Sequence, residues 1–432
     1  MMERLMLLTF LVTTTVLCHE PFQMIFEWKS FDFHWPSEEQ RKYDILRGEY
    51  IPENILITTV KFWKGKMYLT LPRWKVGVPV TLGVTSSKPI NGHQVTAPKL
   101  DAFPSWDMQK LDYCAAFQLV HSIEIDPKGR MWVLDSGRPI FLRQYKADCP
   151  PRLVILDLED NDKILRTYEF PEHVTNRRDA YLNDIVLDHE NGGMAYITDT
   201  SSTDPGIIVY SLKDNNSWKV RHDSMKAKPE TKSFMVANTR LKNPIDVDGI
   251  ALSPASNRDR QVYYSPLFSF HLYSVPASVL KNNVTNIDQY VKELGRKFSQ
   301  TDGMMMSATG VLYFGLLADD AIATWDTKNT TSFTVGQRVI WRDHVLTQWP
   351  DSFAFDEDGN VWCVTNMLQN FLIKHVDVNV SIRLIRSHVG VRSYQYYENG
   401  TAPALPDITS SANSVRFVFA ALLLVALILI AK

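Results

Sequence analysis

The chain has 432 residues, of which 45% are hydrophobic and 22% charged, and its formal net charge at pH 7 is -2. This composition supports a large buried core, and the length alone would allow two or three domains. No block of lysine and arginine stands out, so we expect no nucleic-acid partner. Aromatic residues make up 11% of the chain, and Pro and Gly are spread along it, which is typical of many short strands joined by turns.

The N-terminal residues 1–18 have the pattern of a secretory signal peptide. Arg4 provides a positive charge, residues 5–17 are largely apolar, and Val16 and Cys18 suit the small-residue positions before a cleavage site. We therefore expect cleavage after Cys18 and an extracellular mature protein. The alternative is a buried N-terminal helix, which the threonine run 13–15 disfavours.

Sequons for N-glycosylation agree with export, because Asn-x-Ser/Thr sites are glycosylated in the secretory pathway and on exposed loops. Five of them occur in polar stretches, at Asn215, Asn283, Asn329, Asn379 and Asn399. We predict that these asparagines lie on the surface and are glycosylated.

The C-terminal residues 417–431 form an unbroken apolar run behind Arg416 and the small-residue stretch 410–414. As a helix this run would rise roughly 22 Å, which is less than a hydrocarbon core of about 30 Å. Two hypotheses stay open, a lipid-anchor (GPI) signal and a single membrane anchor. Both place residues 406–432 outside a folded domain of residues 19–405 and make the membrane a partner of the tail.

Cysteine usage predicts one disulfide. Cys18 would leave with the signal peptide, and an odd number of cysteines in an oxidising compartment predicts one bridge and one free thiol. Cys114 and Cys149 lie in connecting segments around one predicted strand pair, so we pair them. Cys363 lies inside a predicted strand and is expected to be a small buried hydrophobic residue rather than a nucleophile.

One pattern recurs along the chain: a polar residue, a small residue, alternating apolar residues, a turn, and a second strand that includes an aromatic residue. Its copies are residues 58–71, 121–135, 183–199, 248–266, 302–316 and 351–366. Each copy predicts two antiparallel strands, and the starts are spaced by about 50 to 65 residues, enough for a four-stranded blade. The sequence therefore predicts an all-β fold, a six-bladed β-propeller, because one blade cannot bury both of its faces alone.

Two aligned positions stand out in these copies. The opening residue is always polar, and these six residues form what we call the polar ring: Thr58, His121, Asn183, Asp248, Asp302 and Asp351. The first strand of a propeller blade lines the central tunnel, so the ring would converge at one mouth. The alternative is that each ring residue only caps a local turn. The second position is always aromatic and is predicted to fill the space between blades: Tyr68, Trp132, Tyr196, Tyr263, Tyr313 and Trp362.

The sequence resembles the Yellow / major royal jelly protein family of insects from about residue 26 to residue 397. The resemblance is found in FEWKSFDFHWPSEEQR (26–41), LPRWKVGVPVTLG (71–83), GRMWVLDSGR (129–138), CPPRLVILDL (149–158), YLNDIVLD (181–188), DGIALSP (248–254), YYSPLFSFHLYSVP (263–276) and VWCVTN (361–366). It implies a six-bladed propeller and a bridge between Cys114 and Cys149. The apolar tail departs from the family pattern, since most members look freely secreted, and suggests attachment to the outer cell surface.

The resemblance implies several functions, because family members diverge. Some act in cuticle pigmentation and melanin formation, some convert dopachrome, some bind biogenic amines in the tunnel, and some are nutritive secreted proteins. We expect a role in the pigmentation pathway with a small catechol or amine ligand, and both an isomerase and a non-enzymatic binder stay open.

Dopachrome conversion moves a proton from a ring carbon to a ring oxygen, and a histidine assisted by carboxylates suits both steps. His121 is the one histidine of the polar ring and is our predicted general base. Asp248, Asp302 or Asp351 would orient the substrate or hold an ammonium group.

Amine binding would use the same ring without turnover, with a carboxylate and an aromatic face for the protonated amine. Residues after the second strands would lie at the same mouth and add contacts, and we predict Asp135, Asp199 and Asn366 as ligand-binding residues beside Thr58 and Asn183.

A third hypothesis is metal-dependent lactone hydrolysis, for which Asn183, Asp248, Asp302 and Asp351 would supply oxygen ligands. Under the first two hypotheses we expect no cofactor and no metal. The sequence contains no G-x-S-x-G, Walker, H-E-x-x-H or C-x-x-C motif.

Overall fold

The computed structural model describes residues 20–89, 97–139, 149–231, 233–255, 259–330, 332–373 and 381–408. The predicted signal peptide, the sequon Asn379 and the apolar run 417–431 lie outside these described residues. A search of the described residues finds no helix that is both long and apolar enough to span a membrane.

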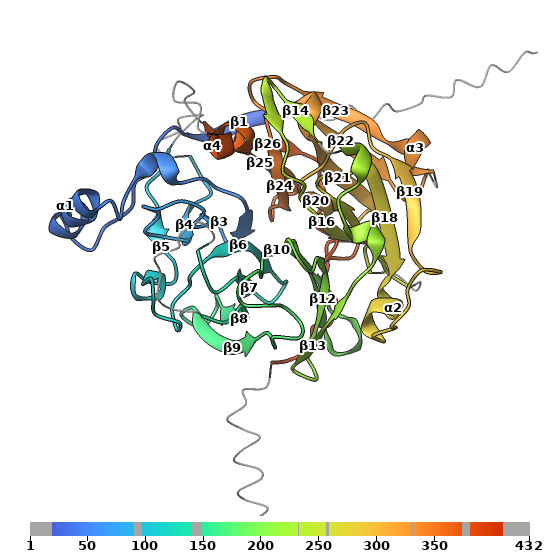
Figure 1. The fold of residues 1–432 in the computed structure, drawn as a ribbon, viewed down its shortest axis with the longest axis horizontal. Coiled ribbons are helices and arrows are strands. Elements are labelled where there is room, and N and C mark those ends of the chain that lie inside the picture. Colours follow the sequence, from blue (N-terminus) through green and yellow to red (C-terminus); the bar gives the residue numbers. More distant parts are fainter. Residues whose placement is uncertain are drawn as a thin grey trace, which may run out of the picture.

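Six four-stranded antiparallel sheets surround a central axis, which confirms the predicted six-bladed propeller (Figure 1). Blade 1 contains β2 (Val60–Trp63), β3 (Lys66–Thr70), β4 (Leu82–Ser86) and β5 (Asp101–Ala102). Blade 2 contains β6 (Val120–Ile125), β7 (Arg130–Asp135), β8 (Arg152–Asp157) and β9 (Lys163–Glu169). Blade 3 contains β10 (Leu182–Asp188), β11 (Met194–Asp199), β12 (Gly206–Ser211) and β13 (Asn216–Val220).

Blade 4 contains β16 (Val247–Leu252), β17 (Gln261–Pro266), β18 (His271–Pro276) and β19 (Lys292–Arg296). Blade 5 contains β20 (Met304–Met306), β21 (Val311–Leu316), β22 (Ala321–Asp326) and β23 (Arg338–Arg342). Blade 6 contains β24 (Pro350–Phe355), β25 (Asn360–Thr365), β26 (Ile382–His388) and β1 (Gln23–Trp28). Each repeat copy in the sequence therefore corresponds to the first two strands of a blade.

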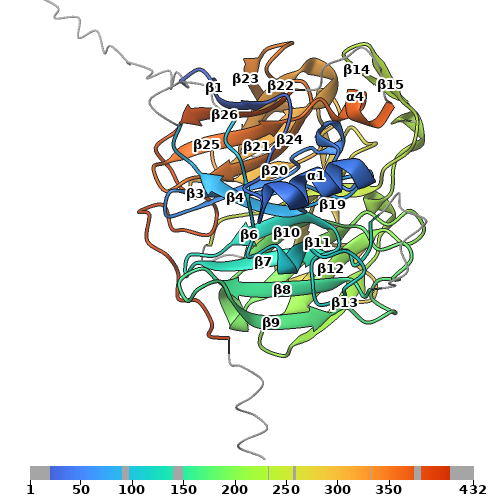
Figure 2. The same ribbon diagram turned by 90° about the vertical axis from the view of Figure 1, so that its left-hand side faces the viewer.

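The connecting segments include four short α-helices and one hairpin. The helices are α1 (Glu38–Arg47), α2 (Ala277–Lys281), α3 (Phe333–Gly336) and α4 (Leu368–Ile373), and the hairpin is β14 (Phe234–Val236) with β15 (Thr239–Leu241). Single 3₁₀ turns occur at Pro52–Asn54, Asp107–Gln109, Glu190–Gly192, Asp223–Met225, Pro229–Thr231 and Leu317–Asp319. The hairpin and α4 lie at one face of the disc, and the segment after β26 runs along the opposite face (Figure 2).

The first strands of neighbouring blades contact one another in a closed circle around the axis, in the order β2, β6, β10, β16, β20, β24 and back to β2. This crowding explains the glycine that follows the ring residue in blades 4 and 5. A Cβ on Gly249 would stand 2.1 Å from the Asp302 carbonyl oxygen, and one on Gly303 would stand 2.1 Å from the Asp351 carbonyl oxygen. In blade 6 the Ser352 hydroxyl instead donates to the Thr58 carbonyl at 2.5 Å.

The aromatic position is buried in all six blades, and in four of them its ring meets an aromatic ring of the next blade. Trp132 packs edge-on against Tyr210, with ring centroids 6.3 Å apart, and Trp362 lies 4.8 Å from Phe62. Tyr263 meets Trp325 and Tyr313 meets Phe355 in the same way. The prediction that these residues fill the space between blades is confirmed at these four positions.

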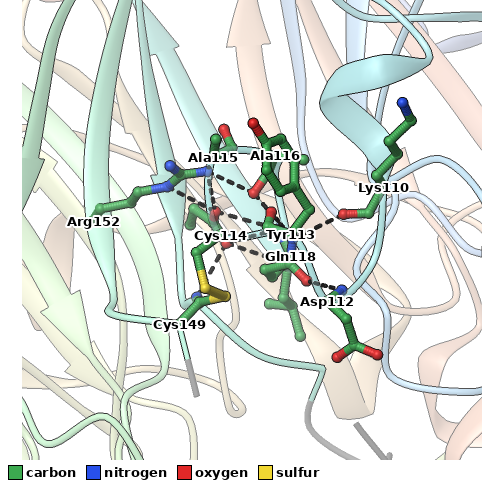
Figure 3. Close-up of a disulfide and its surroundings, with 12 residues drawn as sticks. Lys110, Asp112, Tyr113, Cys114, Ala115, Ala116, Gln118, Cys149 and Arg152 are labelled. Carbon is green, nitrogen blue, oxygen red and sulfur yellow. Dashed lines mark hydrogen bonds and ion pairs between the residues drawn. A yellow bond between two sulfur atoms is a disulfide. The ribbon is translucent and has the colours of Figure 1, made fainter. Parts of the chain in front are cut away.

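The disulfide between Cys114 and Cys149 is present, as predicted (Figure 3). It joins the segment before β6 to the segment before β8. The Arg152 guanidinium also donates to the Ala116 carbonyl at 2.6 Å, and the Gln118 side chain donates to the Tyr113 carbonyl at 3.0 Å. The loop is therefore held by side chains from the blade as well as by the bridge.

The C-terminal segment of the described chain closes the face opposite α4. Tyr394 is fully buried there, its amide donates to the Met306 carbonyl, and its hydroxyl accepts from the Leu187 amide at 2.8 Å. The Pro406 carbonyl accepts from Arg130 at 2.6 Å, and Ile408 packs against the core of blades 2 and 3. Packed chain therefore continues to Ile408, slightly beyond the predicted domain limit at residue 405.

The four described sequon asparagines, Asn215, Asn283, Asn329 and Asn399, are all exposed. Their positions suit glycosylation, which stays a prediction.

Candidate functional site

A cavity of about 330 Å³ opens at the propeller face where α4 lies. Five of the six polar ring residues line it: His121, Asn183, Asp248, Asp302 and Asp351. Thr58 is not among its described lining residues, because this side chain is fully buried and its hydroxyl donates to the His121 carbonyl at 2.8 Å. The tertiary structure therefore brings together five side chains that are far apart in sequence.

Irregularities in the first strands help to place these side chains. In blades 2, 3, 4 and 6 the pairing register between the first two strands shifts close to the ring residue, between Val120 and Ile123 in blade 2 for example. A β-bulge bends a strand and redirects a side chain. In these four blades the irregular pairing lies beside the ring residue, whose side chain lines the cavity instead of continuing the sheet.

His121 is held as a neutral imidazole with one nitrogen available. Its Nδ1 lies 3.0 Å from the Asn183 carbonyl oxygen, which can only accept, so Nδ1 bears the hydrogen and Nε2 keeps its lone pair. Burial lowers the pKa of His121 to about 4, with the hydrogen bond to Asn183 opposing that change. At neutral pH the side chain is therefore uncharged and able to accept a proton.

Asp248, Asp302 and Asp351, which we call the carboxylate cluster, behave as a coupled acidic group. Burial raises the pKa of Asp302 to about 7, although its carboxylate accepts a hydrogen bond from the Trp349 indole at 2.6 Å. Burial and then the nearby Asp302 carboxylate raise the pKa of Asp248 and of Asp351 well above the ordinary range. Because like charges this close cannot all ionise, the cluster retains protons at neutral pH.

Asp135 and Asp199 are fully buried and are not among the described residues that line the cavity. Asp135 accepts from the Leu119 amide at 3.0 Å and from the Arg152 guanidinium at 3.1 Å. Asp199 accepts from the Tyr181 amide at 3.0 Å and from Lys219 at 2.8 Å. Both residues were predicted to bind ligand, but their oxygens are occupied by main-chain and cationic donors that anchor loops.

Asn366 and Asn183 have supporting contacts. The Asn366 amide donates to Asp351 at 2.6 Å and to the Ile57 carbonyl at 2.9 Å, so it acts on the cavity through Asp351. The Asn183 side chain lines the cavity and donates to the Thr200 hydroxyl at 3.0 Å.

Sequence reasoning missed three aromatic residues that line the cavity, Trp74, Tyr181 and Trp349, and three charged ones, Arg138, Asp179 and Asp246. A signal for two of them was present. Tyr181 and Asp246 each stand two positions before a ring residue, and alternate residues of an extended segment point to the same side. Trp349 has the same spacing, but its φ of 54° is not that of an extended segment, so the spacing does not explain its position.

Within the described residues, no three His, Cys, Asp or Glu side chains are arranged to hold a metal ion. The metal-dependent hydrolysis hypothesis stays untested.

Comparison with known proteins identifies the family. The model of the major royal jelly protein family matches residues 118–389, well over half of the chain. The chain is 28% identical over 384 residues to Dopaminechrome tautomerase of Drosophila melanogaster, covering 85% of this chain and 82% of that protein. It is 29% identical over 362 residues to Protein yellow of Drosophila madeirensis, covering 82% of this chain but only 62% of that protein. The chain therefore belongs to the major royal jelly protein family.

Proposed function

We propose that this chain is an extracellular protein of the cuticle pigmentation pathway that isomerises an aminochrome, an indoline quinone, in the cavity. One observation is central: a neutral histidine with a free Nε2 and a proton-retaining carboxylate cluster share one cavity of about 330 Å³. A relative that is named Dopaminechrome tautomerase supports the same chemistry.

The reaction is redox-neutral and needs proton transfer alone. One hydrogen leaves each of the two saturated ring carbons as a proton. One of the two electron pairs left behind becomes the new ring double bond, the other passes into the quinone ring, and the two quinone oxygens take up protons and become hydroxyls. His121 Nε2 would accept a carbon-bound proton, and a protonated carboxyl of the cluster would supply one to oxygen. A pKa of about 7 for Asp302 is well matched to acid–base work at neutral pH.

The charges of the cavity favour an aminochrome without a carboxylate. Five acidic side chains line it, Asp179, Asp246, Asp248, Asp302 and Asp351, whereas Arg138 is the one lysine or arginine among the described lining residues. A substrate carboxylate bound in the cavity would meet one cationic side chain among the described lining residues, and it would repel any member of the cluster that ionises. We therefore expect faster conversion of dopaminechrome than of dopachrome, which differs by its carboxylate.

A conversion assay on the purified mature protein tests the proposal. His121→Ala should lower turnover by about 10²–10⁴-fold, because it removes the proton acceptor. His173→Ala is the matched control, since His173 is exposed and is not among the residues lining the cavity. Absence of conversion by the wild type would overturn the proposed activity, and unchanged turnover in His121→Ala would overturn the role of His121.

The pH profile of turnover tests the acid and the base together. Activity needs neutral His121 and a protonated cluster, so it should fall below about pH 4 and above about pH 7. In Asp302→Asn the fall in turnover above about pH 7 should disappear, because the group that loses its proton there is gone. Turnover that increases through pH 7 would contradict the role of Asp302 as the acid.

Amine binding without turnover is a second candidate, favoured by the carboxylate cluster beside the aromatic faces of Trp74, Tyr181 and Trp349. Calorimetry with dopamine or serotonin tests it. Heat of binding without any aminochrome conversion would support this function, and absence of heat at high ligand concentration would exclude it.

A further inference from the structure

The cavity has two chemically different sides. Blades 2 and 3 supply the uncharged ring residues His121 and Asn183, and blades 4 to 6 supply the carboxylate cluster. On the uncharged side two aromatic rings flank the imidazole: the Trp74 centroid lies 5.5 Å and the Tyr181 centroid 5.2 Å from that of His121. A bound molecule therefore meets acidic groups on one side and aromatic residues with polar hydrogens on the other.

Trp74 presents a buried hydrogen-bond donor that has no partner. Its side chain is 5% exposed, and its Nε1 is enclosed without a hydrogen bond to any described residue. Leaving such a group unpaired costs about 1–3 kcal/mol, so an unpaired donor in a ligand cavity points to a functional use.

Tyr181 lines the same cavity as Trp74, and both rings lie beside His121. Burial and then the charges of Asp248, Asp302 and Asp351 raise the pKa of Tyr181 well above its ordinary value, and the Trp74 side chain opposes that rise. The phenol consequently stays protonated. Because an indole N–H can only donate, a hydrogen bond from Trp74 would use the hydroxyl oxygen and would leave the hydroxyl hydrogen free to point to a ligand. Asp199 fixes the Tyr181 main chain by accepting from its amide at 3.0 Å.

We propose that Tyr181 donates a hydrogen bond to a quinone or catechol oxygen of the ligand, with Trp74 as the positioning residue for its hydroxyl. This inference rests on the proposed function for its catalytic consequence. When a carbon-bound proton leaves an aminochrome, negative charge develops on a quinone oxygen, and a fixed donor at that oxygen stabilises the transition state.

The binding experiment compares dopamine with phenethylamine, which has the same amine chain and lacks both ring oxygens. Calorimetry on the wild type should show that dopamine binds roughly three- to tenfold more tightly than phenethylamine, which is the difference expected from one hydrogen bond. Tyr181→Phe should bind the two ligands equally, and Trp74→Phe should reduce the difference while leaving phenethylamine affinity unchanged. Asp302→Asn should weaken both ligands by the same factor.

Tyr43→Phe is the matched control, because this tyrosine is 51% exposed on α1. Preference for dopamine that persists in Tyr181→Phe, or that is absent from the wild type, would overturn the inference. Circular dichroism of each variant verifies the fold.

The turnover experiment separates this inference from the proposed function. If the wild type converts dopaminechrome, Tyr181→Phe should lower kcat by about 10²–10³-fold, as expected for one oxyanion donor. Unchanged kcat in this variant overturns the inference and leaves the proposed function standing. If the wild type converts nothing, the proposed function fails, and the dopamine–phenethylamine comparison still decides the role of Tyr181.

Discussion

At the scale of single residues, Lys297 is a buried cation that the proposed chemistry does not use. Its side chain contacts the Ser265 hydroxyl and lies 3.4 Å from the His271 carbonyl, and the described residues include no carboxylate paired with it. Lys219 in blade 3, by contrast, is paired with Asp199 at 2.8 Å. Burial lowers the pKa of Lys297 to about 7, because the charged ammonium loses its hydration when the chain folds.

The stability of a Lys297→Met variant should therefore differ from the wild type in a pH-dependent way. An unfolded lysine titrates at about pH 10.4, so between about pH 7 and pH 10 the unfolded chain binds more protons than the native one. The wild type should gain stability relative to the variant over this range, as measured by urea unfolding at pH 7, 8.5 and 10. Lys242→Met, an exposed site, is the control. Parallel curves for wild type and Lys297→Met would contradict the shift.

At the scale of elements, the closure of the ring depends on β1. This strand pairs antiparallel with β26, so the start of the described chain supplies the outermost strand of the last blade. Phe26 is fully buried and stacks on Trp28 at 5.7 Å and on Trp362 at 6.3 Å. The joint between the two ends of the propeller is thus an aromatic core as well as a hydrogen-bonded ladder.

Truncating Phe26 should weaken this joint. We expect Phe26→Ala to lower the free energy of unfolding by about 3–5 kcal/mol through lost burial and the cavity left behind. Leu46→Ala on α1 is the control, because Leu46 is 86% exposed and its loss should change stability by no more than about 0.5 kcal/mol. Urea unfolding measures both. Equal stability of the two variants would show that β1 does not hold the ring closed.

At the scale of the whole molecule, the two faces of the disc have different roles. One face holds the open cavity beside α4, and the other is covered by the segment that includes Tyr394. Residues 405–407 attach to blade 2 through Lys128 and Arg130, so the described chain ends on that side of the propeller. A membrane anchor in the residues that follow would leave the cavity face free for ligands.

The predicted anchor can be tested in cells that express the full chain. We expect the full-length protein on the outer cell surface and a chain ending at residue 408 in the medium, as measured by fractionation. Release by a phospholipase that cleaves GPI anchors would select the GPI hypothesis, and resistance would select a single membrane anchor. Full-length protein found only in the medium would contradict both.

The repeat in the sequence determined the fold class, the blade count, the ring positions and the aromatic packing between blades, because each depends on a local strand–turn–strand pattern. Cysteine placement determined the disulfide in the same way. The tertiary structure decided three other features. It placed β1 as the strand that closes the ring, and it gave Asp135 and Asp199 hydrogen bonds that anchor loops. It also brought the aromatic residues Trp74, Tyr181 and Trp349 to the cavity. The physical reason is that these features depend on which loops meet over the axis and how deeply they bury their charges. Burial also determined the chemistry of the polar ring, since it keeps His121 neutral and the carboxylate cluster protonated.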